Sequence, residues 1–336
     1  MADAKLTALS ETSVPDVADL LYSVDVSDTT DDAAGSSRKL TFKRLGGMLM
    51  PGTVNGRLTL ATGTPVTTSD QTSKSTIYFT PFGGNTVAVY DGTRWILYSF
   101  SELSLSLGTI TSGANYDVFL YDSSGLTLKL GPAWSSDTAR GTGAGTTEIT
   151  TQDGVYVNAN SITSGPGPKA GLYLGTLRTT STTTTEDSLA KRFVWNNYNR
   201  MKRPMKNADE PANSWTYGSA TWRQANANSL NKVEYVVGQQ YNAIRARVIS
   251  TIYSYGNIAA NAVGVDSTTS PSGHWQETAG SSVEHGLANP EYNGFPGLGY
   301  HALNWIEARI AGSGSYSGYG DDGGNIQSGI QAEVIG

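Results

Sequence analysis

The sequence contains no cysteine. Disulfide bridges and thiolate metal sites are therefore excluded, and cysteine usage gives no indication of the redox compartment. Apolar runs of membrane-spanning length are also missing, and the opening residues, "MADAKLTALSETSVPD", lack the apolar core of a secretory signal. From these absences we expect a soluble protein that is made in a cytoplasm.

Charged residues are scarce as well. They make up 15% of the chain, whereas about a quarter is usual in globular proteins. Glycine is abundant, with 39 residues, so polarity that comes from serine, threonine and asparagine must replace much of the missing charge. This composition suits short strands joined by many turns, and it suits surfaces that pack against copies of the same chain.

The net charge of −6 is unevenly distributed. Residues 1–206 contain 18 basic and 18 acidic side chains, whereas residues 207–336 contain 5 basic and 11 acidic ones. A surface that binds nucleic acid needs an excess of the opposite sign. We therefore expect no nucleic-acid partner.

Sequence motifs for catalysis are also absent. There is no HExxH pair, no G-x-S-x-G elbow and no P-loop. Three histidines lie near three glutamates, which would permit a zinc site, but solvated loop residues are the favoured interpretation. These six residues are His274, His285, His301, Glu277, Glu284 and Glu291.

Two further chemical alternatives are weaker. Asp321 and Asp322 in "YGDDGGN" could bind calcium, although aspartate, glycine and asparagine together more often mark a turn. Paired carboxylates for sugar cleavage stay open, because such pairs are set by space and not by sequence. We predict no enzyme activity, no cofactor and no metal.

Strand signals dominate the chain. In "TVAVYDGTRWILYSF", Asp91 and Gly92 separate two apolar runs, which predicts a β-hairpin. In "AIRARVISTIYSY", apolar residues from Ile244 to Ile252 alternate with Arg245 and Arg247, which predicts a half-buried antiparallel strand. Helix signals are few, and "GYHALNWIEARI" fits a helix or a strand equally well. The sequence predicts a mainly β fold.

The domain organisation follows from turns and composition. Residues 1–50 form a small segment, with a helical turn and a strand in "PDVADLLYSVDVS" and a short strand closed by glycines in "RKLTFKRLGGMLMPG". Residues 51–205 and 206–336 form two antiparallel β domains of sandwich or jelly-roll style, with a linker near 205–213.

The stretch from Thr179 to Lys206 joins a threonine tract to cations interleaved with aromatic residues. A nucleic-acid groove would need this mixture but conflicts with the net charge. An amphipathic membrane helix conflicts with the asparagines and with cations that cluster at the ends. A strand that joins domains or subunits fits best. The residues predicted to make that contact are Arg192, Trp195, Tyr198, Arg200 and Arg203.

Aromatic residues gather in the C-terminal part. Some must belong to its core, and an exposed subset could stack on sugar rings of a host-surface glycan or meet a host protein. The residues predicted for such a receptor-binding face are Trp215, Trp222, Trp275, Tyr292 and Tyr300.

Several stretches resemble known proteins. The segment "KLTALSET…VADLLYSVDVSD…SRKLTFKRLGG" is similar to the N-terminal segments of tailed-bacteriophage tail fibres and other virion proteins. "GRLTLATGTPVTTSD", "TIYFTPFGGNTVAVYDGTRW" and "YLGTLRTTSTTTTEDSLAKRFVWNNYNRMKRP" resemble a module of phage and prophage structural proteins. Together these stretches cover most of residues 1–205. "GYHALNWIEARI" and "QSGIQAEVIG" resemble the ends of similar proteins.

The resemblance implies a β-rich component of the virion, assembled as a homotrimer and attached to other virion proteins through residues 1–50. It brings no catalytic residues. We expect a fibre or tail-associated appendage, with a head decoration or head-fibre protein on the capsid as the alternative. A polysaccharide-degrading tailspike is a further alternative, but the sequence lacks the regular repeat of a long β-helix.

Overall fold

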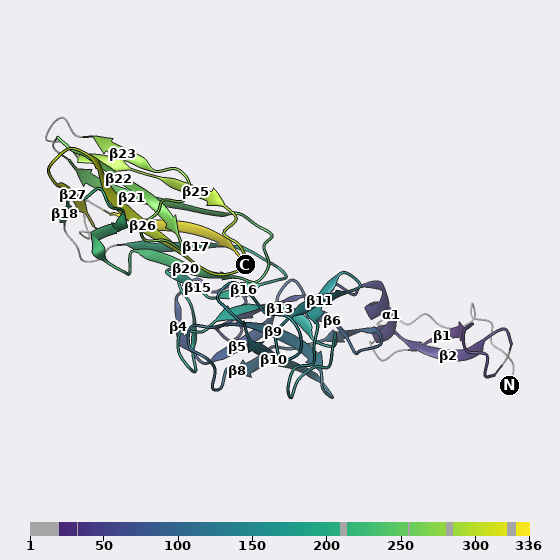
Figure 1. The fold of residues 1–336 in the computed structure, drawn as a ribbon. Coiled ribbons are helices and arrows are strands. Elements are labelled where there is room, and N and C mark those ends of the chain that lie inside the picture. The colour runs from purple at the N-terminus through teal and green to yellow at the C-terminus, as the bar shows by residue number, and fades with distance from the viewer. Residues whose placement is uncertain (1–19, 32, 209–213, 255, 280–284, 321–326) are drawn as a thin grey trace.

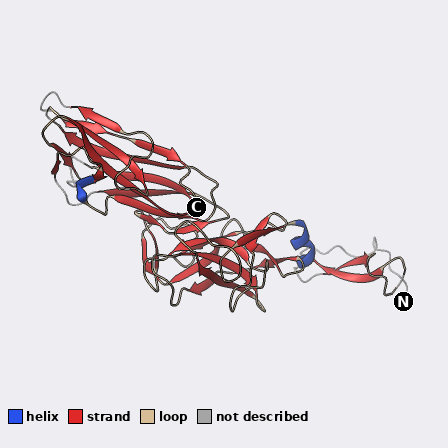
Figure 2. Ribbon diagram, in the orientation of Figure 1, coloured by secondary structure: helices blue, strands red, loops and turns tan. Residues whose placement is uncertain are grey.

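The computed structural model describes residues 20–31, 33–208, 214–254, 256–279, 285–320 and 327–336. The described chain is mainly β, as predicted (Figure 2). It is elongated, with a hairpin at one end, a β domain in the middle and a second β domain at the other end (Figure 1). No helix in these ranges has the length and apolar character needed to span a membrane.

The N-terminal hairpin pairs β1 (Leu20–Asp25) with β2 (Ser36–Thr41) in antiparallel register. The chain then forms α1 (Phe42–Leu49), where a strand closed by glycines was predicted. That prediction was wrong beyond Thr41, whose hydroxyl accepts a hydrogen bond from the Arg44 amide and starts the helix. A Cβ at Gly47 would lie 2.3 Å from the carbonyl oxygen of Trp95, so this glycine allows close helix packing.

The middle domain surrounds one apolar core, which includes Ile77, Val87 and Leu120. The hairpin predicted at Asp91 and Gly92 is confirmed. The Asp91 carboxylate accepts hydrogen bonds from the backbone amides of Thr93 and Arg94 in the turn. The strands of this domain are β3 (Gly56–Thr59), β5 (Thr76–Pro81), β6 (Thr86–Tyr90), β7 (Trp95–Ser99), β8 (Leu103–Ser106), β9 (Asn115–Asp122), β10 (Leu126–Ala133), β11 (Ile149–Gln152), β12 (Val155–Asn158), β13 (Leu172–Arg178) and β16 (Val194–Asn196).

The C-terminal domain is a sandwich of two sheets around a second core, which includes Tyr235, Val248 and Trp305. One sheet contains β17 (Lys202–Ala208), β28 (Gly329–Ile335), β21 (Ile244–Tyr253), β27 (Tyr316–Tyr319) and β18 (Trp215–Tyr217), with β24 (His285–Ala288) and β25 (Glu291–Gly294) also paired to β21. The facing sheet contains β20 (Lys232–Val237), β26 (Gly299–Ala311), β22 (Ile258–Val265), β23 (Gln276–Ala279) and β19 (Arg223–Gln224), which leads into a 3-10 turn, η2 (Ala225–Ala227).

The structure tests two sequence predictions in this domain. The alternation predicted for β21 is confirmed, with Ile244, Ala246 and Val248 buried while Arg245 and Arg247 are exposed. The segment that fitted a helix or a strand is the strand β26, which pairs with β20 on one side and β22 on the other.

One sheet continues across the junction between the two domains. The strands β4 (Gln71–Lys74), β14 (Thr185–Asp187) and β15 (Lys191–Arg192) come from the middle part, and β15 pairs in parallel with β20. The expected boundary between residues 205 and 206 falls inside β17, so residues 205–208 of the expected linker are strand. Residues 209–213 of that linker lie outside the described residues, as does most of the expected helical turn before β1.

Candidate functional site

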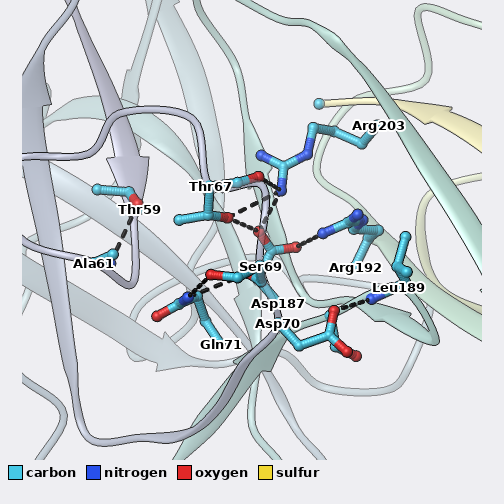
Figure 3. A network of polar contacts seen from close by, with 12 residues as sticks. Thr59, Ala61, Thr67, Ser69, Asp70, Gln71, Asp187, Leu189, Arg192 and Arg203 are labelled. Atoms are coloured by element: carbon cyan, nitrogen blue, oxygen red, sulfur yellow. Dashed lines mark hydrogen bonds and ion pairs between the residues drawn. The ribbon is translucent and has the colours of Figure 1, made fainter.

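The most distinctive polar site lies at this junction, where Asp187 meets two arginines (Figure 3). Arg203 Nη2 lies 2.8 Å from Asp187 Oδ2, and Arg192 Nη1 lies 3.3 Å from Oδ1. The three side chains are at most 10% exposed. Thr67 Oγ1 donates a further hydrogen bond to the same carboxylate. Buried charges of this kind require one another, because an unpaired buried ion is strongly destabilising.

Local structure brings these groups together. Asp187 ends β14, and a tight turn, closed by a hydrogen bond from the Ser188 amide to the Lys191 carbonyl, places Arg192 opposite it. The Arg192 guanidinium also donates to the carbonyl of Pro204, at 3.1 and 2.8 Å. The Arg192 side chain therefore covers part of the edge of β17 at Pro204, a residue that has a backbone acceptor but no backbone N–H donor.

Arg57 is a second buried cation at this junction, with 1% of its surface exposed. Its guanidinium donates to the carbonyls of Pro65, Asn199 and Gly336. Burial, with the nearby positive charge of Arg203, lowers the pKa of Arg57 to about 10. The side chain stays charged at neutral pH and links three segments that are distant in the sequence.

A third group joins the same two domains. Arg140 Nε lies 2.6 Å from Asp117 Oδ2, and the carboxylate is fully buried. Arg140 Nη2 also donates to the carbonyl of Gly238 in the C-terminal domain, at 2.7 Å. A Cβ at Gly238 would lie 2.1 Å from the Tyr173 hydroxyl, so only glycine permits this approach.

Trp195 and Arg200, which were also predicted to join domains or subunits, lie at the junction. Trp195 is 2% exposed, and its Nε1 donates to the carbonyl of Ile335 at 3.0 Å. Arg200 donates to Asn242 Oδ1 at 3.1 Å, and its guanidinium lies 4.3 Å from the centre of the Tyr241 ring.

Tyr198 packs against the core of the middle domain, and burial raises the pKa of its phenol. The structure therefore places four of the five predicted joining residues in contacts at the junction, and it places Tyr198 against the core of the middle domain. The sequence did not single out Asp187, the partner of Arg192 and Arg203, and it gave no indication of Arg57, Arg140 or Asp117.

The five aromatic residues predicted for receptor binding are not brought together. Trp215 donates from Nε1 to Glu307 at 2.8 Å and contacts the Trp305 ring edge-on inside the sandwich. Tyr300 lies at the junction, where it donates to Glu234 and stacks under the Arg178 guanidinium.

Tyr292 packs against the C-terminal core. Trp222 and Trp275 do meet, with ring centres 6.1 Å apart, and Trp275 is 44% exposed. Aromatic content alone could not separate the exposed Trp275 and its half-buried neighbour Trp222 from the buried rings, because aromatic residues are favoured at both kinds of position.

The histidines do not form a metal cluster in the described residues. His301 is buried, and its Nδ1 lies 2.7 Å from Asp266 Oδ2, whereas His274 is exposed and Glu291 pairs with Arg245. No group of three or more histidine, aspartate or glutamate side chains in the described ranges is placed to hold a metal. Glu284, Asp321, Asp322 and the side chain of His285 lie outside what the structure describes.

Comparison with known proteins gives no family. No family model matches the chain, and no curated protein matches it. Among solved structures, the insecticidal delta-endotoxin Cry8Ea1 of Bacillus thuringiensis is 9% identical, with a TM-score of 0.23, over 84% of this chain and 52% of that one. A Cry1Da tryptic core variant of the same organism is 8% identical, with a TM-score of 0.19, over 78% of this chain and 48% of that one. The chain thus spans about half the length of these proteins, and such low similarity carries no functional argument.

Proposed function

We propose that this chain is a non-enzymatic structural protein of a tailed-bacteriophage particle, namely a fibre or a tail-associated appendage. The observation that carries the proposal is the linear order of its parts. A small hairpin stands at one end, and the C-terminal domain stands at the other (Figure 1). In the proposed role, residues 1–50 attach to other virion proteins and residues 206–336 face the host surface.

The N-terminal segment supports the attachment role. A two-stranded ribbon is marginally stable by itself, so a hairpin that stands away from the body needs a partner. Its described part and the end of α1 expose six apolar side chains to water, which in a charge-poor protein indicates a surface that packs on another molecule. These side chains are Leu20, Val24, Val26, Met48, Leu49 and Met50.

The junction supports the appendage role. An appendage that reaches from particle to host must keep its two ends in a fixed relation. The continuous sheet through β15 and β20, together with the buried pairs at Asp187 and Asp117, locks the middle and C-terminal domains together. Rotation of one domain against the other would separate Arg203 on β17 from Asp187, which leaves buried charge unpaired at a cost of several kcal/mol, and it would break the hydrogen bond from Arg140 to the Gly238 carbonyl.

Labelling of whole particles tests the proposal. An immunoblot of purified particles is expected to detect the chain, and an antibody against the C-terminal domain is expected to label the tail in electron micrographs. Label over the capsid would replace the appendage with a head decoration or head fibre. A chain that is missing from purified particles would overturn the proposal.

The attachment surface gives a variant test. We expect the M48S/L49S variant to reach particles at least about tenfold less efficiently, because burying each of these side chains stabilises an interface by about 1.5–3 kcal/mol. Incorporation is measured by quantitative immunoblot after complementation of a phage that lacks the gene. The control is L230S, because Leu230 is 69% exposed in the C-terminal domain. Equal incorporation of both variants would contradict the attachment role.

The proposed assembly is a homotrimer. The scarcity of surface charge supports it, since strand edges that lack charged side chains are usually covered by neighbours. We expect light scattering at micromolar concentration to give three times the 35.5 kDa mass of the chain. The mass of a single chain, unchanged on concentration, would contradict the trimer.

A further inference from the structure

The outer face of the β17, β28 and β21 sheet carries two rows of polar side chains. Register places Lys206, Gln331 and Arg247 in one row, and Pro204, Glu333 and Arg245 in the other. These residues alternate with core residues such as Met205, Ala246 and Ile330, so both rows point away from the sandwich. On the next strand, β25, Glu291 and Asn293 extend the rows and are exposed.

This face has an excess of positive charge that its own carboxylates do not balance. Lys202 pairs with Glu333 at 3.1 Å, and Arg245 pairs with Glu291 at 3.0 Å. Arg247 instead donates to the amide oxygen of Gln331, and neither Arg247 nor Lys206 has an ion pair with any described residue. Two cations are therefore uncompensated, although residues 207–336 contain 5 basic and 11 acidic side chains.

A hollow of about 300 Å³ lies between the two rows. Its walls are the side chains of Lys202, Arg245, Arg247, Gln331 and Glu333. Ala246 and Ala332 also line it. Their methyl groups point toward the core, so the bottom of the hollow is formed by the backbone of these two residues. The volume lies at the lower end of the range for small-ligand sites, roughly 300–1,000 Å³, and suits a short segment of a chain.

The mixture of groups decides which ligand fits. Guanidinium groups bind carboxylates through paired hydrogen bonds, while the Gln331 amide and the Glu333 carboxylate can accept from hydroxyl groups. An acidic sugar offers both a carboxylate and hydroxyls. Nucleic acid fits poorly, because its dense phosphates would meet Glu333 and Glu291 in a domain of net negative charge.

We propose that this outer face binds a carboxylated polysaccharide, with Arg247, which has no carboxylate partner among the described residues, holding the carboxylate of a sugar unit in the hollow that Arg245 also lines. The inference rests on the proposed function, because an acidic glycan of the host surface is a partner that the distal domain of an appendage would meet. The sequence predicted only that Arg245 and Arg247 lie on the solvent side of a strand.

Titration of the full chain tests the site. The probe is an oligogalacturonate of six units at low ionic strength, and the neutral control is a glucose oligomer of the same length. Binding of the acidic probe alone is expected, and added salt should weaken it. The R245Q/R247Q variant is expected to bind at least about tenfold more weakly, since the charge-assisted contact of Arg247 is lost together with the neighbouring positive charge of Arg245.

A matched variant controls for total charge. R94Q/K169Q removes two cations from exposed positions of the middle domain and should bind like the parent. Equal weakening by both variants, or no binding of the acidic probe, would overturn the proposal. Equally tight binding of a single-stranded oligonucleotide would also overturn it, by showing a general polyanion surface. These outcomes are independent of the particle immunoblot, so failure of the site and failure of the proposed function are distinguishable.

Discussion

Replacing Asp187 by alanine is expected to lower the free energy of unfolding by about 3–5 kcal/mol, because the change leaves two buried cations without a counter-ion. Arg192 and Arg203 are 7% and 10% exposed, so water cannot replace the lost carboxylate. Thr67 would keep one contact with Arg203 through Oγ1, at 3.2 Å, and this hydrogen bond cannot balance a full charge. The junction should therefore weaken before either core does.

Denaturant titration and calorimetry measure this effect. If Asp187 couples the domains, the D187A variant should unfold at lower denaturant, and the two domains should separate into distinct transitions. The control is E291A, which breaks the exposed pair with Arg245 and should cost about 1 kcal/mol at most. A loss for D187A as small as that for E291A would show that the buried cluster does not stabilise the junction.

The sequence predicted those parts of the fold that depend on neighbours in the chain. The Asp91–Gly92 hairpin and the alternation in β21 are local patterns, and each is observed. The basic and aromatic stretch was also predicted to join domains or subunits from its composition. In each case a few adjacent residues carry the signal, so no knowledge of distant partners is needed.

Partners that lie far apart in the sequence were not predictable. Arg57 reaches Gly336, and Trp195 reaches Ile335, and no pattern within either segment indicates the other. The same difficulty explains why α1 was missed, because Gly46 and Gly47 allow the helix to pack closely on Leu97 and Trp95 of β7. It also explains why Trp215 was assigned to a surface, when its partner Glu307 lies 92 residues away.

The low charge content has a structural explanation. Arginine residues that would normally solubilise a surface are instead buried at the junction or beside it. These are Arg57, Arg140, Arg178, Arg192 and Arg203, and all five are buried. The surface is left to serine, threonine and glycine, which leaves few charged side chains to keep strand edges apart. This distribution supports the proposed assembly with other chains.

Replacing Glu307 by alanine should be comparably severe, but for a different reason. Its carboxylate is 1% exposed and accepts hydrogen bonds from Trp215 Nε1, the Tyr316 hydroxyl and Arg223, at 2.8 to 3.0 Å. The Asn226 amide donates a further hydrogen bond at 3.0 Å. Alanine would remove the acceptor that these four groups share, which leaves the buried Tyr316 hydroxyl and the Arg223 charge without their partner, and we expect a loss of about 3–5 kcal/mol.

The E307Q variant separates charge from shape at this position. Glutamine keeps the side-chain volume and one acceptor oxygen. Its NH2 group, however, would face hydrogen-bond donors where the second carboxylate oxygen now accepts, so a smaller loss of about 1–3 kcal/mol is expected. Denaturant midpoints of the three proteins should therefore fall in the order parent, E307Q, E307A. Since Glu307 lies within the C-terminal sandwich, the loss should appear in the transition of that domain, whereas D187A should act on the coupling between domains. Equal stability of E307A and the parent would mean that these donors find other acceptors, and it would contradict a stabilising role for the buried Glu307 carboxylate.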